Sequence, residues 1–240
     1  MKKNNNITDA STLSEMVEFT LLDPRAITKD IHTLINVAIK NNYNSVCVNP
    51  CNVKLAREYI DKTLGVDFSV VSVIGFPLGA NTINSKVFEI KQARKDGADE
   101  VDVVLNIAKI KEGDYNYLKA EITKVLKSAK DLIVKAIIET CYLTRDEMKQ
   151  ICKLCEKLKV DFIKTSTGYG TGGATVDDVI FIKECVKGKI GIKASGGIKT
   201  KEQAEELVRA GATRIGSSRT IWWKKNLFLN LSMKLIKLHQ

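Results

Sequence analysis

Histidine is scarce in this 240-residue chain. Only His32 and His239 are present, and neither lies near the end of a predicted strand. Histidine is the side chain that most often transfers protons in enzymes. If the chain is an enzyme, its proton transfers must therefore depend on Asp, Glu and Lys.

Long apolar runs are also missing. No apolar stretch reaches the roughly 18 residues that a membrane-spanning helix needs. The first residues, MKKNNNITDAS, lack the apolar core of a secretory signal. We therefore expect a soluble, cytoplasmic protein that has no membrane as a partner.

The cysteines do not form a metal-binding pattern. The chain has six of them, and the closest pair for a zinc site, Cys152 and Cys155, lies within a predicted helix (147–159). No second Cys or His pair follows at the spacing that zinc requires. Reduced thiols and the absence of a metal are the expectation.

The formal charge is +10, from 38 Lys and Arg against 28 Asp and Glu. Such an excess raises the possibility of nucleic acid as a partner. The lysines are spread over the whole length, however, largely in amphipathic helical stretches such as 119–131, and no RRM, KH or zinc-finger pattern accompanies them. This favours a solvated surface without nucleic acid, whose positive field helps to gather an anionic, phosphorylated substrate.

Apolar runs bounded by turn residues predict eight strands, each followed by a helical pattern. The predicted strands are 17–22, 45–49, 68–75, 100–106, 133–140, 161–167, 189–195 and 213–218. Strands that alternate with helices pair in parallel, and eight such units favour a single α/β domain, a (β/α)₈ TIM barrel over residues 1–240 with a frayed segment 1–10. The alternative, an open doubly wound sheet, would show a glycine-rich turn after the first strand, and residues 20–24 contain no glycine.

Two lysines end short β-like apolar runs, Lys164 in FIKTSTGYG and Lys193 in IGIKASGG. A lysine in a packed core loses hydration, and its pKa falls. A second ammonium nearby lowers the pKa further, from an ordinary value of about 10.4, and so makes the amine nucleophilic. The pair indicates amine chemistry by way of a Schiff base, with phosphate or carbonyl binding as the alternative.

Further polar groups follow the strands, and a barrel brings the carboxyl ends of all its strands to one mouth. Asp102, Lys135, Glu139, Thr167 and Ser195 are examples. A buried Asp102 needs a partner, for which a neighbouring lysine is expected. Glycines after strands 6, 7 and 8 offer backbone N–H groups to a phosphate, although glycine is also ordinary at such turns.

The chain resembles the deoxyribose-phosphate aldolases, which are class I aldolases of deoxynucleoside breakdown. The resemblance runs from about residue 17 to about residue 218. It is carried by VCVNP (46–50), VIGFPLGAN (73–81), GADEVDVVLNIAKIKEGDY (97–115), KAIIETCYLT (135–144), DFIKTSTGYGTGGAT (161–175), IKASGGIKT (192–200) and AGATRIGSS (210–218).

The resemblance implies a role for each matching residue. Lys164 corresponds to the Schiff-base lysine, Lys193 to the neighbour that lowers its pKa and joins the proton relay, and Asp102 to the proton donor and acceptor. The implied substrate-binding residues are Lys135, Thr20, Cys47 and Thr167, and the implied phosphate-binding residues are Gly168, Gly196, Gly197, Gly216 and Ser218. The implied reaction is reversible cleavage of 2-deoxy-D-ribose 5-phosphate by a homo-oligomer, dimer or tetramer, without cofactor or metal.

Two segments depart from the family pattern. Relatives usually read Asp-His-Thr-Leu-Leu-Lys-Pro at the first strand, whereas this chain has EFTLLDP (18–24), so we expect an altered rim there. After Ser218 the family continues with small residues, whereas this chain has RTIWWKK (219–225) and a lysine-rich helix. Arg219 could add a phosphate contact, or Trp222 and Trp223 could change helix packing or an oligomer face.

Two other functions remain open. One is a phosphosugar isomerase or epimerase on the same barrel, which would use the lysines to stabilise an enediolate. The other is a basic nucleic-acid-binding or scaffold protein without catalytic activity. The isomerase or epimerase would form no imine that can be trapped, whereas the second protein would bind oligonucleotide with a steep salt dependence and turn over no sugar phosphate.

Overall fold

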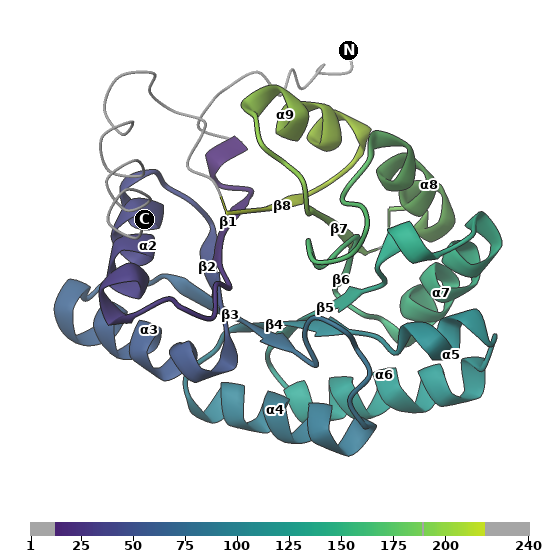
Figure 1. The fold of residues 1–240 in the computed structure, drawn as a ribbon, viewed down its shortest axis with the longest axis horizontal. Helices are drawn as coiled ribbons and strands as arrows, with labels where there is room; N and C mark the ends of the chain where they lie inside the picture. Colours follow the sequence, from purple (N-terminus) through teal and green to yellow (C-terminus); the bar gives the residue numbers. More distant parts are fainter. Residues whose placement is uncertain (1–12, 189, 219–240) are drawn as a thin grey trace, which may run out of the picture.

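The computed structural model describes residues 13–188 and 190–218. Eight parallel strands form a closed barrel in sequence order, and β8 pairs with β1 (Figure 1). This confirms the predicted TIM barrel and excludes the open sheet. The strands are β1 (Val17–Leu21), β2 (Ser45–Val48), β3 (Ser69–Ile74), β4 (Glu100–Val104), β5 (Ile133–Ile137), β6 (Phe162–Lys164), β7 (Gly191–Ser195) and β8 (Arg214–Ser217).

Helices surround the barrel (Figure 1). They are α2 (Thr28–Lys40), α3 (Val53–Tyr59), α4 (Ile83–Lys95), α5 (Ile107–Lys111), α6 (Tyr115–Ala129), α7 (Arg145–Leu158), α8 (Val176–Val186) and α9 (Lys201–Ala210), with short helical turns η1 (Pro50–Asn52), η2 (Ile60–Leu64) and η3 (Thr140–Tyr142). Threonine caps several of them. Thr144 and Thr200 begin α7 and α9 with capping boxes, in which the side chain of the residue three positions later hydrogen-bonds back to the threonine.

All eight predicted strands are present, but two of them end three residues earlier than predicted. The run 133–140 is a strand only as far as Ile137, and Glu139 takes a left-handed conformation with φ 53°. The run 161–167 ends as a strand at Lys164. Thr140 N–H donates to the Thr165 carbonyl beyond both strands. Glu139 and Thr167 therefore lie in loops over the barrel mouth.

Period-2 alternation along β4 predicts that Asp102 lies on the face opposite Val103 and Leu105, and the structure confirms this. Val101, Val103 and Leu105 belong to the apolar layer between strands and helices, whereas Asp102 contacts side chains of the barrel interior. Inside the barrel, Cys47, Val71 and Val73 form a smaller apolar cluster. The remaining interior positions are unusually polar, which makes this interior the place to look for chemistry.

The cysteines agree with the expectation of reduced thiols, because all six are free. Cys152 and Cys155 are buried in α7 as part of the core. Within residues 13–188 and 190–218, no group of three His, Cys, Asp or Glu side chains is arranged to hold a metal ion. In the same ranges, no helix combines the length and the apolar character needed to cross a bilayer.

A buried ion pair secures the loops that follow β3 and β4. Lys86 of α4 is fully buried, and its Nζ lies 2.5 Å from Glu121 Oε1 of α6. The same nitrogen donates to the carbonyls of Gly79 and Val104, each at 2.7 Å. Glu121 Oε2 in turn accepts the N–H of Asn106 at 3.1 Å. The pair thereby connects two mouth loops to two helices.

We expect Lys86→Met to lower the free energy of unfolding by about 3–5 kcal/mol, because Glu121 would stay buried without its cation. Urea unfolding measures this loss. Lys91→Met, on the exposed face of the same helix, is the control and should change stability by less than about 0.5 kcal/mol. Adding Glu121→Gln to Lys86→Met should restore part of the loss, and a Lys86→Met protein as stable as the control would contradict the assignment.

Candidate active site

Three lysines and one aspartate converge inside the barrel. The strand register places Asp102 of β4 beside Lys135 of β5, and Lys164 of β6 beside Lys193 of β7. None of the four side chains is more than 2% exposed. Four adjacent strands therefore direct their charged side chains to one buried point.

Asp102 is the centre of this group. Its Oδ2 accepts hydrogen bonds from Lys164 Nζ at 2.8 Å and from Lys193 Nζ at 2.6 Å, and its Oδ1 accepts one from Lys135 Nζ at 3.1 Å. This confirms that the buried aspartate has lysine partners. Because Lys164 and Lys193 share one oxygen atom, the two ammonium groups are close enough to repel each other strongly.

Two glutamates complete the network, and the sequence alone did not identify either as a site residue. Glu18 of β1 is fully buried, forms an ion pair with Lys193, and lies 3.4 Å from Lys135 Nζ. Glu100 of β4 forms an ion pair with Lys135. Glu100 lies two residues before Asp102, so strand alternation already indicates that both share a face.

The expectation that the unusual first strand alters the rim is wrong for Glu18, which lies in the barrel interior. Phe19, its neighbour, points the other way and packs edge-on against Tyr43 with ring centroids 5.6 Å apart. Only Asp23 is on the surface, where it pairs with Arg25 at 2.9 Å. The side-chain hydrogen bond from Arg25 lowers the pKa of Asp23 to about 2. The segment 219–225, the other divergent region, lies outside the described residues.

Ion pairing determines the charge of two groups. Burial opposes the ionised form of Asp102, but Lys135, Lys164 and Lys193 outweigh it and hold the pKa of Asp102 well below its ordinary value. Burial likewise opposes the charge of Lys193, but Asp102 and Glu18 outweigh it and raise the pKa of Lys193 well above its ordinary value. Asp102 is therefore an anion and Lys193 a cation across the physiological pH range.

The cations of this cluster outnumber its carboxylates. The carboxylates are Glu18, Glu100 and Asp102, and the cations beside them are Lys135, Lys164, Lys193 and Arg214, whose Nε lies 3.7 Å from Glu18 Oε1. One cation is therefore in excess among the described residues. The pKa of Lys135 is raised, like that of Lys193, by carboxylates that outweigh its burial, so both of these lysines are held as cations.

Aromatic side chains border the mouth next to Lys164. The Phe76 ring, from the loop after β3, lies 5.9 Å from Lys164 Nζ. Tyr169, from the loop after β6, packs edge-on against Phe76 at 5.3 Å between centroids, and its hydroxyl donates to the Leu22 carbonyl at 3.2 Å. Leu22, Phe76 and Tyr169 also line a cleft of about 390 Å³ that continues over the loops after β1 and β2. Phe76 thus belongs both to this cleft and to the surroundings of Lys164.

The other predicted pocket residues differ in their hydrogen-bond partners and in their burial. Thr20 is half-buried, and its hydroxyl donates to the Glu18 carbonyl at 3.1 Å. Cys47 packs among Val71 and Val73, and burial raises the pKa of its thiol to about 11. Thr167 donates its hydroxyl to Glu139 Oε2 at 2.5 Å. Thr20 and Thr167 thus have partners within the protein, and Cys47 is a neutral thiol.

The glycines predicted to bind phosphate lie at the same end of the barrel, in or next to the ends of β6, β7 and β8. Gly168 and Gly196 have φ of 85° and 88°, which side chains other than glycine rarely adopt. The two loops also touch, since a Cβ on Gly168 would lie 3.7 Å from the Gly196 Cα. Gly197 follows in the same loop as Gly196, while Gly216 is buried in β8 and Ser218 is exposed just after it. Phosphate binding by these residues stays a prediction.

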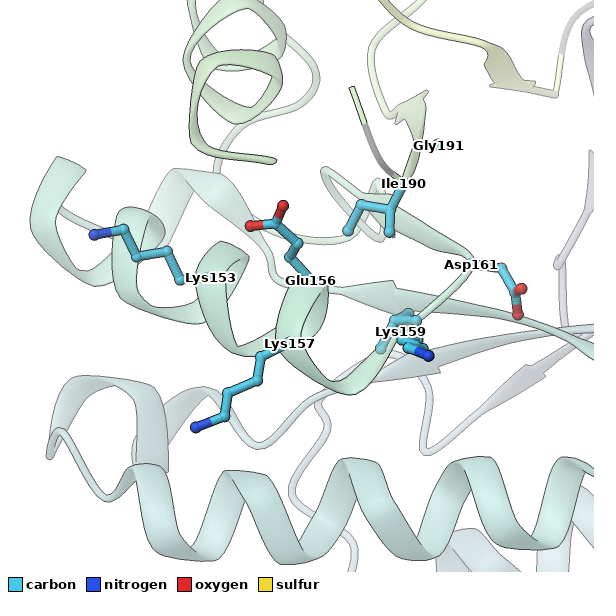
Figure 2. A pocket seen from close by; sticks show the side chains of 8 residues that line it. Lys153, Glu156, Lys157, Lys159, Asp161, Ile190 and Gly191 are labelled. Atoms are coloured by element: carbon cyan, nitrogen blue, oxygen red, sulfur yellow. The ribbon is translucent and has the colours of Figure 1, made fainter. Parts of the chain in front are cut away.

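A larger cleft, of about 670 Å³, lies at the opposite end of the barrel, beside the start of β7. Figure 2 shows that its charged side chains diverge: Lys153, Lys157 and Lys159 point in different directions. Asp161 Oδ2 is already bonded to the Val134 N–H at 2.8 Å. Without converging groups, this cleft is a weaker candidate than the mouth that carries Lys164.

Known proteins resemble this chain over most of its length. Residues 6–222 match the model of a family described as DeoC/LacD family aldolase. The chain is 50% identical over 209 residues to a deoxyribose-phosphate aldolase of Thermoanaerobacter sp. (strain X514), covering 86% of this chain and 92% of that one. It is also 50% identical over 208 residues to the deoxyribose-phosphate aldolase of Thermococcus gammatolerans, with the same coverage of both chains.

A solved structure gives the same result in three dimensions. The tetrameric deoxyribose phosphate aldolase of Aeropyrum pernix superimposes with a TM-score of 0.80 at 30% identity, over 88% of both chains. The two proteins therefore share both the barrel fold and a substantial part of their sequence.

Proposed function

The chain belongs to the DeoC/LacD family of aldolases, and from this premise we propose that it cleaves 2-deoxy-D-ribose 5-phosphate reversibly into D-glyceraldehyde 3-phosphate and acetaldehyde. The observation that best supports this function is the single Asp102 oxygen shared by Lys164 and Lys193. A cation beside a second lysine favours the neutral amine of that lysine, and imine formation requires a neutral amine.

In the proposed reaction, the Lys164 amine adds to the C1 aldehyde of the open-chain sugar. Loss of water from the carbinolamine gives an iminium ion. The C2–C3 bond then breaks, its electrons move into a C1–C2 double bond as the iminium nitrogen becomes neutral, and the C3 hydroxyl loses its proton. Glyceraldehyde 3-phosphate leaves, and the enamine of acetaldehyde stays on Lys164.

Proton transfers then complete the cycle. The enamine takes a proton at C2, and water hydrolyses the resulting iminium to release acetaldehyde and the free lysine. We assign these transfers to Asp102 and Lys193 acting with a water molecule, because both contact Lys164 or its carboxylate partner. Lys135 forms ion pairs with Asp102, Glu18 and Glu100, and substrate binding by Lys135 stays a prediction.

Glyceraldehyde 3-phosphate release from 2-deoxyribose 5-phosphate tests this function. The purified protein should release it at the same rate with and without a chelator, because the iminium takes up the electrons that a metal would otherwise stabilise. Loss of activity with the chelator would contradict the metal-free mechanism. Interconversion of phosphosugars without cleavage would indicate the isomerase or epimerase instead.

We also propose that the protein assembles as a homo-oligomer in the cytoplasm. The relative from Aeropyrum pernix is a tetramer, and six free thiols fit a reducing compartment. Light scattering coupled to size-exclusion chromatography measures the assembly directly, and a monomer at micromolar concentration would contradict it.

A further inference from the structure

One buried carboxylate holds the loop that follows β6. Glu139 is 3% exposed, and both of its oxygens lie 3.2 Å from the N–H of Thr167. Its Oε2 also accepts the Thr167 hydroxyl at 2.5 Å. Thr167 is thus bound to Glu139 through its backbone and through its side chain.

Backbone conformation fixes the position from which Glu139 acts. The residue is left-handed, with φ 53° and ψ 68°, a region that costs a non-glycine residue about 1 kcal/mol or more. The next residue, Thr140, donates its N–H to the Thr165 carbonyl at 2.9 Å. The loops after β5 and β6 are therefore joined by backbone as well as by the carboxylate.

The effect of Glu139 passes along the loop to Gly168 and Tyr169. The Thr167 hydroxyl, held by Glu139, accepts the Tyr169 N–H at 3.0 Å. The amides on either side of Gly168 are thus turned toward protein acceptors. No acceptor within residues 13–188 and 190–218 bonds the Gly168 N–H itself. Gly168, at φ 85° and beside Gly196, is a predicted phosphate-binding position.

We propose that Glu139 is a positioning residue for the substrate phosphate, holding the loop after β6 in the conformation that presents the Gly168 amide to it. This inference rests on the proposed function. Glu139 need not touch the substrate to act, because both of its oxygens already accept hydrogen bonds within the protein, from Thr167 and from the Cys141 thiol. Within residues 13–188 and 190–218 no hydrogen bond or ion pair joins Glu139 to the Asp102 cluster, so the proposal separates phosphate recognition from imine chemistry.

Glu139→Gln tests the proposal, since it keeps the size of the side chain and removes the charge that strengthens its hydrogen bonds. The KM for 2-deoxyribose 5-phosphate should rise about tenfold, as expected when a hydrogen bond to a charged group is weakened. Its kcat should stay within about twofold, since binding of substrate and transition state weakens equally. The kcat/KM for unphosphorylated 2-deoxyribose should also change by less than about twofold.

Thr167→Val is the second variant and removes the hydroxyl that links Glu139 to Tyr169. It should reproduce the loss of phosphate preference, Thr167→Ser should restore it, and the Glu139→Gln/Thr167→Val double variant should be little worse than either single one. If Glu139→Gln fails to fold, the two Thr167 variants decide the question. An equal loss on both sugars, or an unchanged phosphate preference, would overturn the proposal.

The same assay separates this proposal from the proposed function. A wild-type protein that does not cleave 2-deoxyribose 5-phosphate refutes the function. A wild-type protein that cleaves it and prefers the phosphorylated sugar, with variants that keep this preference, refutes the role of Glu139 alone.

Discussion

Replacing Lys164 with leucine should abolish aldolase turnover, with a loss of at least about 10⁴-fold in kcat, because no other group in the cluster can form the covalent intermediate. The fold should persist. Asp102 keeps Lys135 and Lys193 as partners, and leucine fills much of the volume next to Phe76. Steady-state kinetics and circular dichroism of the variant measure both outcomes.

Borohydride trapping tests the same residue directly. Reduction of the wild-type protein in the presence of 2-deoxyribose 5-phosphate or acetaldehyde should leave a covalent adduct on Lys164, which peptide mass spectrometry locates. Lys127, exposed on α6, provides the control, since Lys127→Leu should still be trapped and stay active. An active enzyme whose Lys164 remains unmodified under these conditions would disprove the Schiff-base assignment.

Removing the charge of Lys193 should have the second largest effect. We expect Lys193→Leu to lower kcat by about 10²-fold or more, since one member of the proton relay is lost. The acidic limb of the activity profile should also move to higher pH by about one unit or more, the effect of a nearby like charge. Profiles of kcat/KM from pH 5 to 10 measure the shift.

The sign of this shift follows from the ion pairs of Lys193. Asp102 and Glu18 raise the pKa of Lys193, so its ammonium stays charged throughout that pH range. A constant positive charge beside Lys164 favours the neutral amine at lower pH, and without it the amine forms only at higher pH. Lys193→Arg keeps the charge and should leave the acidic limb closer to its wild-type position. A lower rate with an unmoved profile would show that another group tunes Lys164.

Local patterns in the sequence were sufficient for much of the fold. Eight apolar runs predicted eight strands, and each is present. Period-2 alternation placed Asp102 on the face opposite Val103 and Leu105, as observed. These predictions succeed because a strand or helix is specified mainly by residues within a few positions of one another.

The ends of the strands were less well predicted, because they depend on contacts with residues far away in the sequence. The apolar residues of 133–140 continue past Ile137, but the backbone turns at Glu139 because its carboxylate and the next N–H bind the loop after β6. Thr167, about 28 residues further along the chain, is one end of that interaction. Nothing within the run itself shows where the strand must end.

The sequence by itself determined the barrel and the lysine partners of a buried Asp102, and it predicted Lys164 and Lys193 as the reactive pair. Only the tertiary structure decided that Glu18 and Glu100 join them, that one cation is in excess, and that Glu139 holds the mouth loop. Side-chain period tells which face of a strand a residue occupies, whereas closure of the barrel determines which residues of different strands meet at one depth. The positions of these side chains in space determine which of them are ionised. The interaction of buried ions depends on their separation and solvation, and not on their distance along the chain.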